Sequence, residues 1–249
     1  MSTVATSRRA QRISHEIHRR EVQVRRVESP SPGFRRIVFE GDSLEGFVSL
    51  SFDDHLKFLF DDAQGQPQRR DYTPRRYDAA RGELTVDFAL HGHGPAAAWA
   101  AAAQAGQRAV VAGPRGSFVM PLDLDWHLLI GDASALPAVA RRLEELPAGS
   151  RAIVLLQVAA ADRVPLPTLA DLQLQWFDDD SALLATAREL ALPEGEGQAW
   201  CAGEAGTMKA LRAVLVQELG LHPHAVRAAA YWKHGSVAHH EPLADSLAA

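Results

Sequence analysis

Cysteine is almost absent from this chain of 249 residues, because Cys201 is the only one. A single cysteine excludes an internal disulfide, and it excludes a self-contained iron–sulfur cluster, which takes about four cysteine ligands. If the protein moves electrons, an organic cofactor is therefore the expected carrier. Histidine pairs at 91/93 and 239/240 are the remaining candidate ligands. Neither pair has the carboxylate of an iron facial triad at an obvious spacing, so we expect no protein-bound metal.

Long apolar runs are also absent. No run approaches the roughly 18 residues that a membrane-spanning helix needs. The first nine residues, MSTVATSRR, lack the apolar core of a secretory signal. We therefore expect a cytoplasmic protein without membrane insertion.

Positive charge is concentrated at one end of a chain whose net charge is −5. Residues 1–36 contain nine arginines and three acidic residues. A basic arm of this kind can bind nucleic acid, and such an arm would be expected to carry aromatic residues among the basic ones. The first aromatic residue is Phe34, and residues 19–36 have the pattern of strand and loop. We therefore expect a solvated edge and no nucleic-acid partner.

Short alternating segments broken by glycine and proline dominate the first half. Residues 55–60 and 84–90 each place every second apolar side chain on one face, as half-buried strands do. Six such strands, with an alanine-rich helix at 95–103, predict an antiparallel barrel over residues 19–121. Residues 1–18 are polar, and we expect a frayed or helical extension there.

Apolar runs alternate with helical patterns from about Leu122 onward. The expected strands cover residues 128–130, 152–158, 172–177, 198–202 and 226–232, and the expected helices residues 135–146, 181–192 and 206–219. This alternation predicts a parallel sheet with crossovers. The fold class is thus a two-domain β-barrel plus α/β protein, with residues 122–249 forming the α/β domain and a C-terminal tail.

The most informative segment is RDYTPR at residues 70–75. On an extended segment alternate side chains share a face, so Arg70 and Tyr72 point one way while Thr73 and Arg75 point the other. A flat ring with a pyrophosphate tail suits this set: the tyrosine stacks, the hydroxyl bonds the ring edge and an arginine forks onto phosphates. The alternative is a strand with a solvated charged face.

The segment fits R-x-Y-[ST]-x-R, the flavin signature of the ferredoxin-reductase-like flavoproteins. Residues 20–240 resemble one branch of that group, the siderophore-interacting proteins. The further similar segments, in family order, are DHLK at 54–57, HGHGPAAAWA at 91–100, GPRGS at 113–117, GDASALPA at 131–138 and YWKHG at 231–235. This resemblance implies an FAD-dependent ferric-siderophore reductase.

The resemblance assigns FAD to the first half. Tyr72 and Thr73 act in catalysis by stacking on the ring and bonding its N5 edge, and Arg70 clamps the pyrophosphate. The HGHGPA segment adds a second loop, because a helix start offers free N–H groups to phosphate; a tight turn before a helix is the alternative. The implied FAD contacts are Arg70, Tyr72, Thr73, His91, Gly92, Gly94, Pro95, Ala96 and Ser117.

A nicotinamide cofactor is assigned to the second half. The GDAS segment follows the first parallel strand, where nucleotides bind, although Ala133 replaces the carboxylate of the family's GDETALP. The implied contacts are Gly131, Asp132, Ser134, Ala135, Gly203 and Glu204. After the second strand, Asp162 favours NADH and Arg163 favours NADPH, so the donor stays open between NADPH and NADH, with ferredoxin as a third source of electrons.

The C-terminal motif implies that Tyr231 and Trp232 shield the flavin ring until nicotinamide arrives; an aromatic pair that closes the core is the alternative. Ferric siderophores are commonly anionic, so basic residues would line their cleft. The candidates for binding this substrate are Lys57, Arg75, Arg76, Lys233 and His234.

The expected reaction passes hydride from NAD(P)H to FAD and then single electrons to the Fe(III) of a bound siderophore, releasing Fe(II). It needs positioning rather than a protein acid or base. Two alternatives are a general NAD(P)H:flavin or quinone reductase and a non-catalytic siderophore-binding flavoprotein. We expect a monomer.

Overall fold

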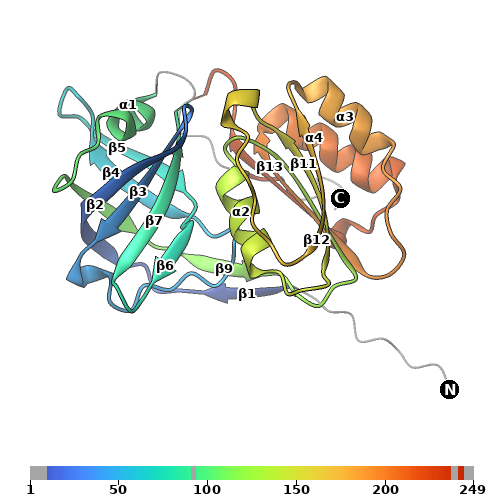
Figure 1. The fold of residues 1–249 in the computed structure, drawn as a ribbon, viewed down its shortest axis with the longest axis horizontal. Coiled ribbons are helices and arrows are strands. Elements are labelled where there is room, and N and C mark those ends of the chain that lie inside the picture. The colour runs from blue at the N-terminus through green and yellow to red at the C-terminus, as the bar shows by residue number, and fades with distance from the viewer. Residues whose placement is uncertain (1–9, 91–93, 237–240, 244–249) are drawn as a thin grey trace, which may run out of the picture.

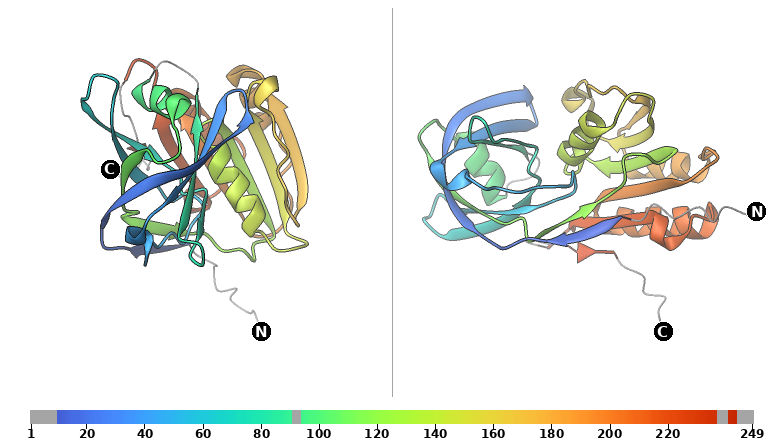
Figure 2. Two further views of the ribbon diagram at one scale, coloured as in Figure 1. Left: turned by 60° about the vertical axis from the view of Figure 1, so that its left-hand side comes forward. Right: turned by 90° about the horizontal axis from the view of Figure 1, so that it is seen from below.

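The computed structural model describes residues 10–90, 94–236 and 241–243. Two large sheets lie side by side, an antiparallel one from the first half of the chain and a mainly parallel one from the second (Figure 1). The turned views show helices packed on the second sheet and a barrel-like curvature in the first (Figure 2). This arrangement confirms the predicted fold class.

The first sheet has seven strands in the order β5-β4-β8-β2-β3-β7-β6, one more than predicted. Their bounds are β2 Arg19–Ser31, β3 Phe34–Glu40, β4 Leu56–Asp61, β5 Pro67–Tyr72, β6 Arg76–Asp78, β7 Glu83–Ala89 and β8 Arg108–Ala112. Strand β6 has only three residues and no apolar alternation, which is why the sequence pattern did not predict it. A single 3₁₀ turn, η1 (Asp42–Leu44), follows β3.

Alternation along the strands builds the core of the first half. Leu56, Phe58 and Phe60 of β4 are buried in turn, as predicted. Helix α1 (Pro95–Ala102) covers this core and inserts Trp99, whose ring lies 4.8 Å from the ring of Phe58. The prediction that Trp99 is a core residue is therefore confirmed.

The second sheet has the order β12-β11-β10-β13-β14-β15, with five parallel strands and an antiparallel edge. The strands are β10 Trp126–Asp132, β11 Arg151–Gln157, β12 Asp171–Phe177, β13 Gly197–Glu204, β14 Val226–Trp232 and β15 Glu241–Pro242. The helices are α2 Leu136–Glu145, α3 Asp180–Arg188 and α4 Ala205–Ala213, which continues as the π-helix η3 Val214–Glu218. Two 3₁₀ turns, η2 Ala160–Asp162 and η4 Pro223–Ala225, complete it.

Helices cover both faces of this sheet. Helix α2 packs Val139 and Leu143 against one face, in a cluster that includes Leu129. Helices α3 and α4 pack Leu183 and Leu211 against the other face. Burial on both faces explains why β10 and β11 are continuous apolar runs rather than alternating ones.

The N-terminal segment differs from the prediction of a frayed or helical extension. Residues Gln11–Ser14 form β1, which pairs antiparallel with β9 (Gly116–Val119). Pairing with β9 satisfies the backbone N–H and C=O groups of β1, so no helix is needed to satisfy them. The polar side chains of β1 stay exposed. Both strands run beneath the two halves (Figure 1).

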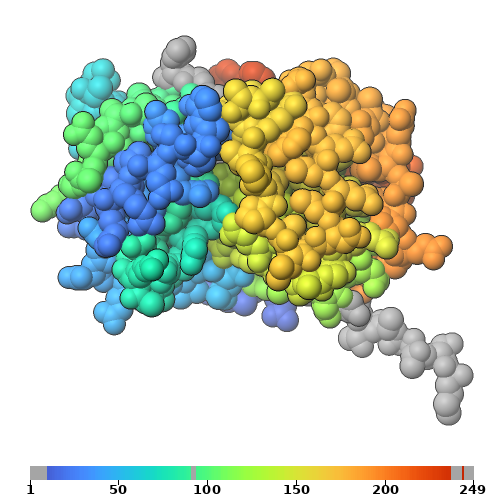
Figure 3. All heavy atoms as spheres, viewed as in Figure 1, coloured from blue at the N-terminus to red at the C-terminus, as the bar shows by residue number. Residues whose placement is uncertain are grey.

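Direct bonds join the two halves. Asp53 Oδ2 accepts hydrogen bonds from Trp200 Nε1 at 3.2 Å and from Arg227 Nε. On another side of the junction, the turn between β2 and β3 adjoins the segment that contains η2 (Figure 3). In the described part of the chain, no helix is long and apolar enough to cross a membrane.

Candidate functional site

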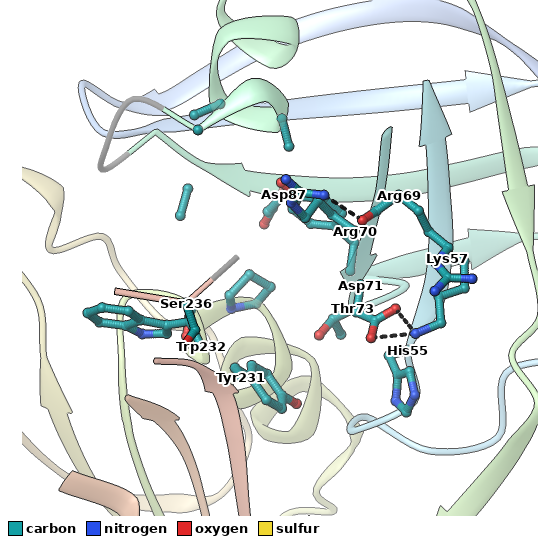
Figure 4. Close-up of a pocket in the computed structure, with 17 residues that line it drawn as sticks. His55, Lys57, Arg69, Arg70, Asp71, Thr73, Asp87, Tyr231, Trp232 and Ser236 are labelled. Carbon is teal, nitrogen blue, oxygen red and sulfur yellow. Dashed lines mark hydrogen bonds and ion pairs between the residues drawn. The ribbon is translucent and has the colours of Figure 1, made fainter. Parts of the chain in front are cut away.

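A cavity of about 400 Å³ lies where the two halves meet. Side chains from the barrel strands form one wall, and those from the end of the parallel sheet form the other (Figure 4). The barrel side contributes His55, Lys57, Arg69, Arg70, Asp71, Tyr72, Thr73, Asp87, Ala89, Gly94, Ala96 and Ala97. The sheet side contributes Ser134, Pro137, Tyr231, Trp232 and Ser236.

The predicted flavin segment lies in this wall. Strand β5 ends at Tyr72, so the alternation expected for residues 70–75 stops there and both Tyr72 and Thr73 line the cavity. The Tyr72 ring packs 4.3 Å from the ring of Phe88. Burial raises the pKa of the Tyr72 hydroxyl, so this group stays protonated at neutral pH. The wall therefore offers an aromatic face beside the buried hydroxyl of Thr73.

The same wall of the cavity also carries charged side chains. Arg70 is half-buried, and its Nη1 donates to the carbonyl oxygen of Arg69 at 2.8 Å, which leaves guanidinium donors for a ligand. Lys57 also lines the cavity, but its Nζ lies 2.6 Å and 2.7 Å from the two carboxylate oxygens of Asp71. The charge of Lys57 is thus partly neutralised by a residue that we had not assigned to the site.

Helix α1 begins at the cavity. Pro95 occupies its first turn, and a Cβ added to Gly94 would meet no atom within 4 Å, so the backbone is open on that side. The amides of Ala96 and Ala97 fall among the first N–H groups of the helix, which have no intrahelical acceptor. Two predicted members of this loop, His91 and Gly92, lie outside the described residues.

Asp132 joins three chain segments at the sheet side. Its Oδ1 accepts from the amide of Ser134 at 2.8 Å and from the Ser134 hydroxyl. Its Oδ2 accepts from Glu204 N at 2.9 Å and from Trp232 Nε1 at 2.7 Å. Close packing explains one nearby glycine, because a Cβ on Gly203 would lie 2.6 Å from Asp132 Oδ2. Asp132 thus organises the site, while Ser134 is the residue that reaches the cavity.

The other predicted nicotinamide residues have structural roles here. Ala135 is fully buried, and a Cβ on Gly131 would lie 2.5 Å from the Ala135 Cβ. Glu204 is the N-cap of α4 and accepts from the amides of Gly206 and Thr207. These residues pack around the carboxyl ends of the paired strands β10 and β13 without lining the described cavity.

Tyr231 and Trp232 form the sheet wall, opposite the barrel strands (Figure 4). Burial raises the pKa of the Tyr231 hydroxyl, and the nearby Thr73 side chain opposes that rise in part. Trp232 is fixed through its indole N–H by Asp132. The structure thus brings the C-terminal aromatic pair and the flavin segment, which are far apart in sequence, into one cavity.

Ser117, predicted to contact FAD, is instead an interior residue. It is 4% exposed, and its hydroxyl donates to Asp54 Oδ2 at 2.7 Å. Ser117 Oγ also accepts from Leu50 N and lies 2.8 Å from His15 Nε2. With these partners, Ser117 joins β9 to the 49–54 loop, and it lies outside the described cavity lining.

Four predicted substrate residues are placed away from the described cavity lining. Arg75 is 7% exposed and forms a bidentate pair with Glu144 of α2. Arg76 lies on the outer strand β6 and is exposed. Lys233 and His234 are exposed beyond the end of β14. Burial and pairing account for Arg75. The other three are exposed, and the ring of His234 lies 4.7 Å from the ring of Trp232.

Asp162 and Arg163, the two residues expected to indicate NADH or NADPH, make contacts within the protein. Asp162 Oδ1 accepts from Gly33 N at 2.6 Å and from Ser31 Oγ at 2.8 Å, so it joins the two halves. Arg163 bonds the Val158 carbonyl oxygen and the carboxylate of Asp178. Neither cue therefore decides between NADPH and NADH.

Several lining residues were missed by sequence reasoning. His55 and Pro137 stand inside the family-like segments and could have been included on that signal. Asp87, on β7, carries no such signal; it faces the cavity because it alternates with the buried Val86 and Phe88, and Arg36 holds it with two bonds of 2.7 Å and 2.8 Å. Arg69 and Ser236 likewise join the site only through the fold.

The cavity fits a flavin dinucleotide in its donor set. An aromatic face and a hydroxyl suit the ring, while Arg70 and the open amides of α1 suit the phosphates. The sheet side offers a serine and an aromatic pair, where a second flat ring would approach. The arrangement therefore suits the transfer of electrons between planar groups rather than acid–base chemistry.

Comparison with known proteins gives an independent result. Residues 124–235 match the family model described as siderophore-interacting protein, and residues 23–69 and 61–118 match the siderophore-interacting FAD-binding domain. The chain is 38% identical to an NADPH-dependent ferric-chelate reductase of Escherichia coli K12, over 91% of this chain and 98% of the relative. It is 31% identical to a ferric vibriobactin reductase of Vibrio cholerae, over 92% and 96%.

Solved structures agree. A siderophore utilization protein from T. fusca superposes with a TM-score of 0.86 at 31% identity, covering 92% of this chain and 98% of that one. A flavohemoglobin from Malassezia yamatoensis with bound FAD and heme gives a TM-score of 0.66 at 13% identity, over 87% and 60%, and shares the fold alone.

Proposed function

The chain belongs to the siderophore-interacting protein family, and from that premise we propose that it is an FAD-dependent ferric-siderophore reductase. One observation carries the proposal: a single cavity is lined by Tyr72 and Thr73 on one wall and by Tyr231 and Trp232 on the other. A flavin bound against the barrel wall would face the sheet wall, where the nicotinamide donor is expected.

We assign the FAD contacts to the barrel wall. Tyr72 would bind the ring by stacking, Thr73 would donate a hydrogen bond to the ring edge, and Arg70 with the first amides of α1 would bind the phosphates. When bound, FAD would supply the chemistry, accepting hydride and delivering single electrons to Fe(III). The chain's own contribution is to orient these partners and exclude water.

We assign the nicotinamide to the sheet wall, beside Ser134. Support comes from its place at the carboxyl end of β10, next to β13, where the order of the parallel strands reverses. We propose NADPH as the donor, because the similar Escherichia coli protein is named an NADPH-dependent ferric-chelate reductase. Ferredoxin as a donor, a monomeric state and a cytoplasmic location remain predictions.

We propose that an anionic ferric siderophore approaches over the Lys57 side of the cavity. His55, Lys57 and Arg69 line that side, and Asp71 is the acid that balances Lys57. A negatively charged chelate would compete with Asp71 for the Lys57 ammonium group. Weak retention of Fe(II) by hard oxygen chelators would then release the metal.

Anaerobic visible spectroscopy of the purified protein tests the proposal. We expect the bound flavin band to bleach on addition of NADPH and to return on addition of a ferric siderophore, with Fe(II) appearing in a trap. A bound flavin that ignores NADPH and NADH would point to a ferredoxin-fed enzyme or a binding protein. Failure to bind flavin after reconstitution would refute the proposal.

A further inference from the structure

Helix α2 touches the cavity at one end and the flavin segment at the other. Pro137, in its first turn, lines the cavity. Arg141 and Glu144, in its last turns, contact residues that directly follow Thr73. At a rise of about 1.5 Å per residue, Pro137 and Glu144 lie about 10 Å apart along the helix axis. One rigid element thus links the two walls.

The segment after Thr73 has little regular structure of its own. Thr73, Pro74 and Arg75 are buried but lie outside any strand. On the barrel side, the amide of Arg75 donates to the Thr85 carbonyl oxygen at 2.9 Å. Side-chain contacts must therefore supply much of the restraint that fixes Thr73.

Those contacts come from α2. Both terminal nitrogens of Arg75 donate to the Glu144 carboxylate, one of them at 2.9 Å. Arg141 Nη1 donates to the Pro74 carbonyl oxygen at 2.9 Å and to Ser49 Oγ at 2.8 Å. A bidentate arginine–carboxylate pair restrains orientation as well as distance, because its two bonds are parallel.

The charges around Arg75 are balanced across the junction. Its Nε lies 3.8 Å from Asp87 Oδ2, and Asp87 is itself held by Arg36. Burial alone would raise the pKa of Glu144, but the bond to Arg75 and the neighbouring arginine charges lower it overall, so the pair is ionised at neutral pH. A chain of alternating charges thus runs from the cavity residue Asp87 to α2.

We propose that Arg75 and Glu144 are a positioning pair for flavin binding: they fix Thr73 and Pro74 against α2 and so set the spacing of the two cavity walls. The expected effect on FAD binding rests on the proposed function, whereas the contact between Arg75 and Glu144 does not. Both residues lie outside the described cavity lining, so their effect on the ligand must be indirect.

The test is a double-mutant cycle on the dissociation constant of FAD. Arg75→Met and Glu144→Gln should each raise the Kd about tenfold, the scale of one lost hydrogen bond to a charged group. The double variant should be no weaker than either single one, because the partners act as a unit. Glu218→Gln is the matched control, since Glu218 pairs with Arg188 of α3 and both side chains are half-exposed.

A second readout uses the flavin-free protein. Amide hydrogen exchange in a peptide covering residues 72–76 should be faster in Glu144→Gln than in wild type, and unchanged in Glu218→Gln. An unchanged FAD Kd, additive single effects or unchanged exchange would each overturn the positioning role. If the wild-type protein binds no FAD, the proposed function fails, and the exchange result alone decides the pair.

Discussion

The indole Nε1 of Trp232 donates a hydrogen bond of 2.7 Å to Oδ2 of Asp132, across 100 residues of sequence. The bond connects the last strand of the parallel sheet to the end of its first strand. Because Oδ2 also accepts from Glu204 N and Oδ1 accepts from Ser134 N, one carboxylate fixes three parts of the site. The aromatic wall of the cavity is therefore held in place by a residue behind it.

Trp232→Phe tests this bond directly, because it removes the indole N–H and keeps an aromatic ring. We expect the free energy of unfolding to fall by about 1.5–3 kcal/mol, the scale of a hydrogen bond to a charged group. Asp132→Ala should cost more, since it loses every bond that the carboxylate accepts. Denaturant unfolding measures both, and additive effects in the double variant would contradict the coupling.

Arg70→Ala tests the proposed phosphate contact. FAD binding should weaken by about 1.5–3 kcal/mol, as expected for a lost charge-assisted hydrogen bond. Equilibrium titration with FAD provides the measurement. Arg81→Ala on the barrel surface, where the side chain is 71% exposed, is the control and should bind FAD normally. Unchanged flavin content in Arg70→Ala would remove Arg70 from the cofactor site.

Lys57 and Asp71 give a pair of opposite predictions. Lys57→Ala should raise the KM for an anionic ferric siderophore with little loss of flavin. Asp71→Asn should lower that KM by a factor of about five or less, because it frees the charge of a lysine whose side chain is 42% exposed. Steady-state kinetics with one siderophore decides both. If flavin occupancy collapses in Lys57→Ala, Lys57 belongs to the FAD site instead.

His127 predicts a pH dependence of stability. It is fully buried; burial first and the Arg142 charge second lower its pKa to about 4. Its neutral form is favoured in the folded state, so its stabilising contribution is complete above pH 6.5 and is lost as pH falls through 4. The loss should reach about 3 kcal/mol, from about 1.4 kcal/mol per unit of pKa.

Unfolding curves between pH 7 and pH 4 test this prediction. In His127→Gln the slope of stability against pH should be shallower across that range. Leu129→Val is the control, because it reduces packing on the same strand without adding or removing a titrating group. An identical slope in wild type and His127→Gln would show that other groups govern the acid response.

Gly131→Ala tests the close packing at the end of β10. The added Cβ would lie 2.7 Å from the Ala202 carbonyl oxygen and 2.5 Å from the Ala135 Cβ, so backbone must move. We expect a loss of about 1–3 kcal/mol in unfolding free energy. Thermal unfolding measures it, with Gly94→Ala as a control in open space.

The arrangement of elements followed closely from the sequence. Alternation around Phe58 marked a half-buried strand, and the apolar run at 128–130 marked a strand buried on both faces. Both patterns report burial along a single strand, which local sequence encodes. The sequence patterns did not predict strands β6 and β1, because their pairing depends on distant partners rather than on their own apolar pattern.

The candidate site was predicted in part. Arg70, Tyr72, Thr73, Ser134 and the pair Tyr231–Trp232 all line one cavity, and the segments that carry them were recognisable by type. Their use as ligand contacts remains a prediction. Ser117 and Arg75 had equally suitable chemistry but were placed in interior bonds, and Asp162 was taken up by the junction of the two halves.

The sequence by itself determined the class of fold, the family and the chemical character of each wall, because apolar period and local motifs depend on neighbours along the chain. Only the tertiary structure decided which charges face the cavity. Arg70 and Arg75 stand five positions apart, yet one lines the cavity and the other is buried against Glu144. That difference depends on α2, whose carboxylate lies 69 residues from Arg75, and no local pattern records such a partner.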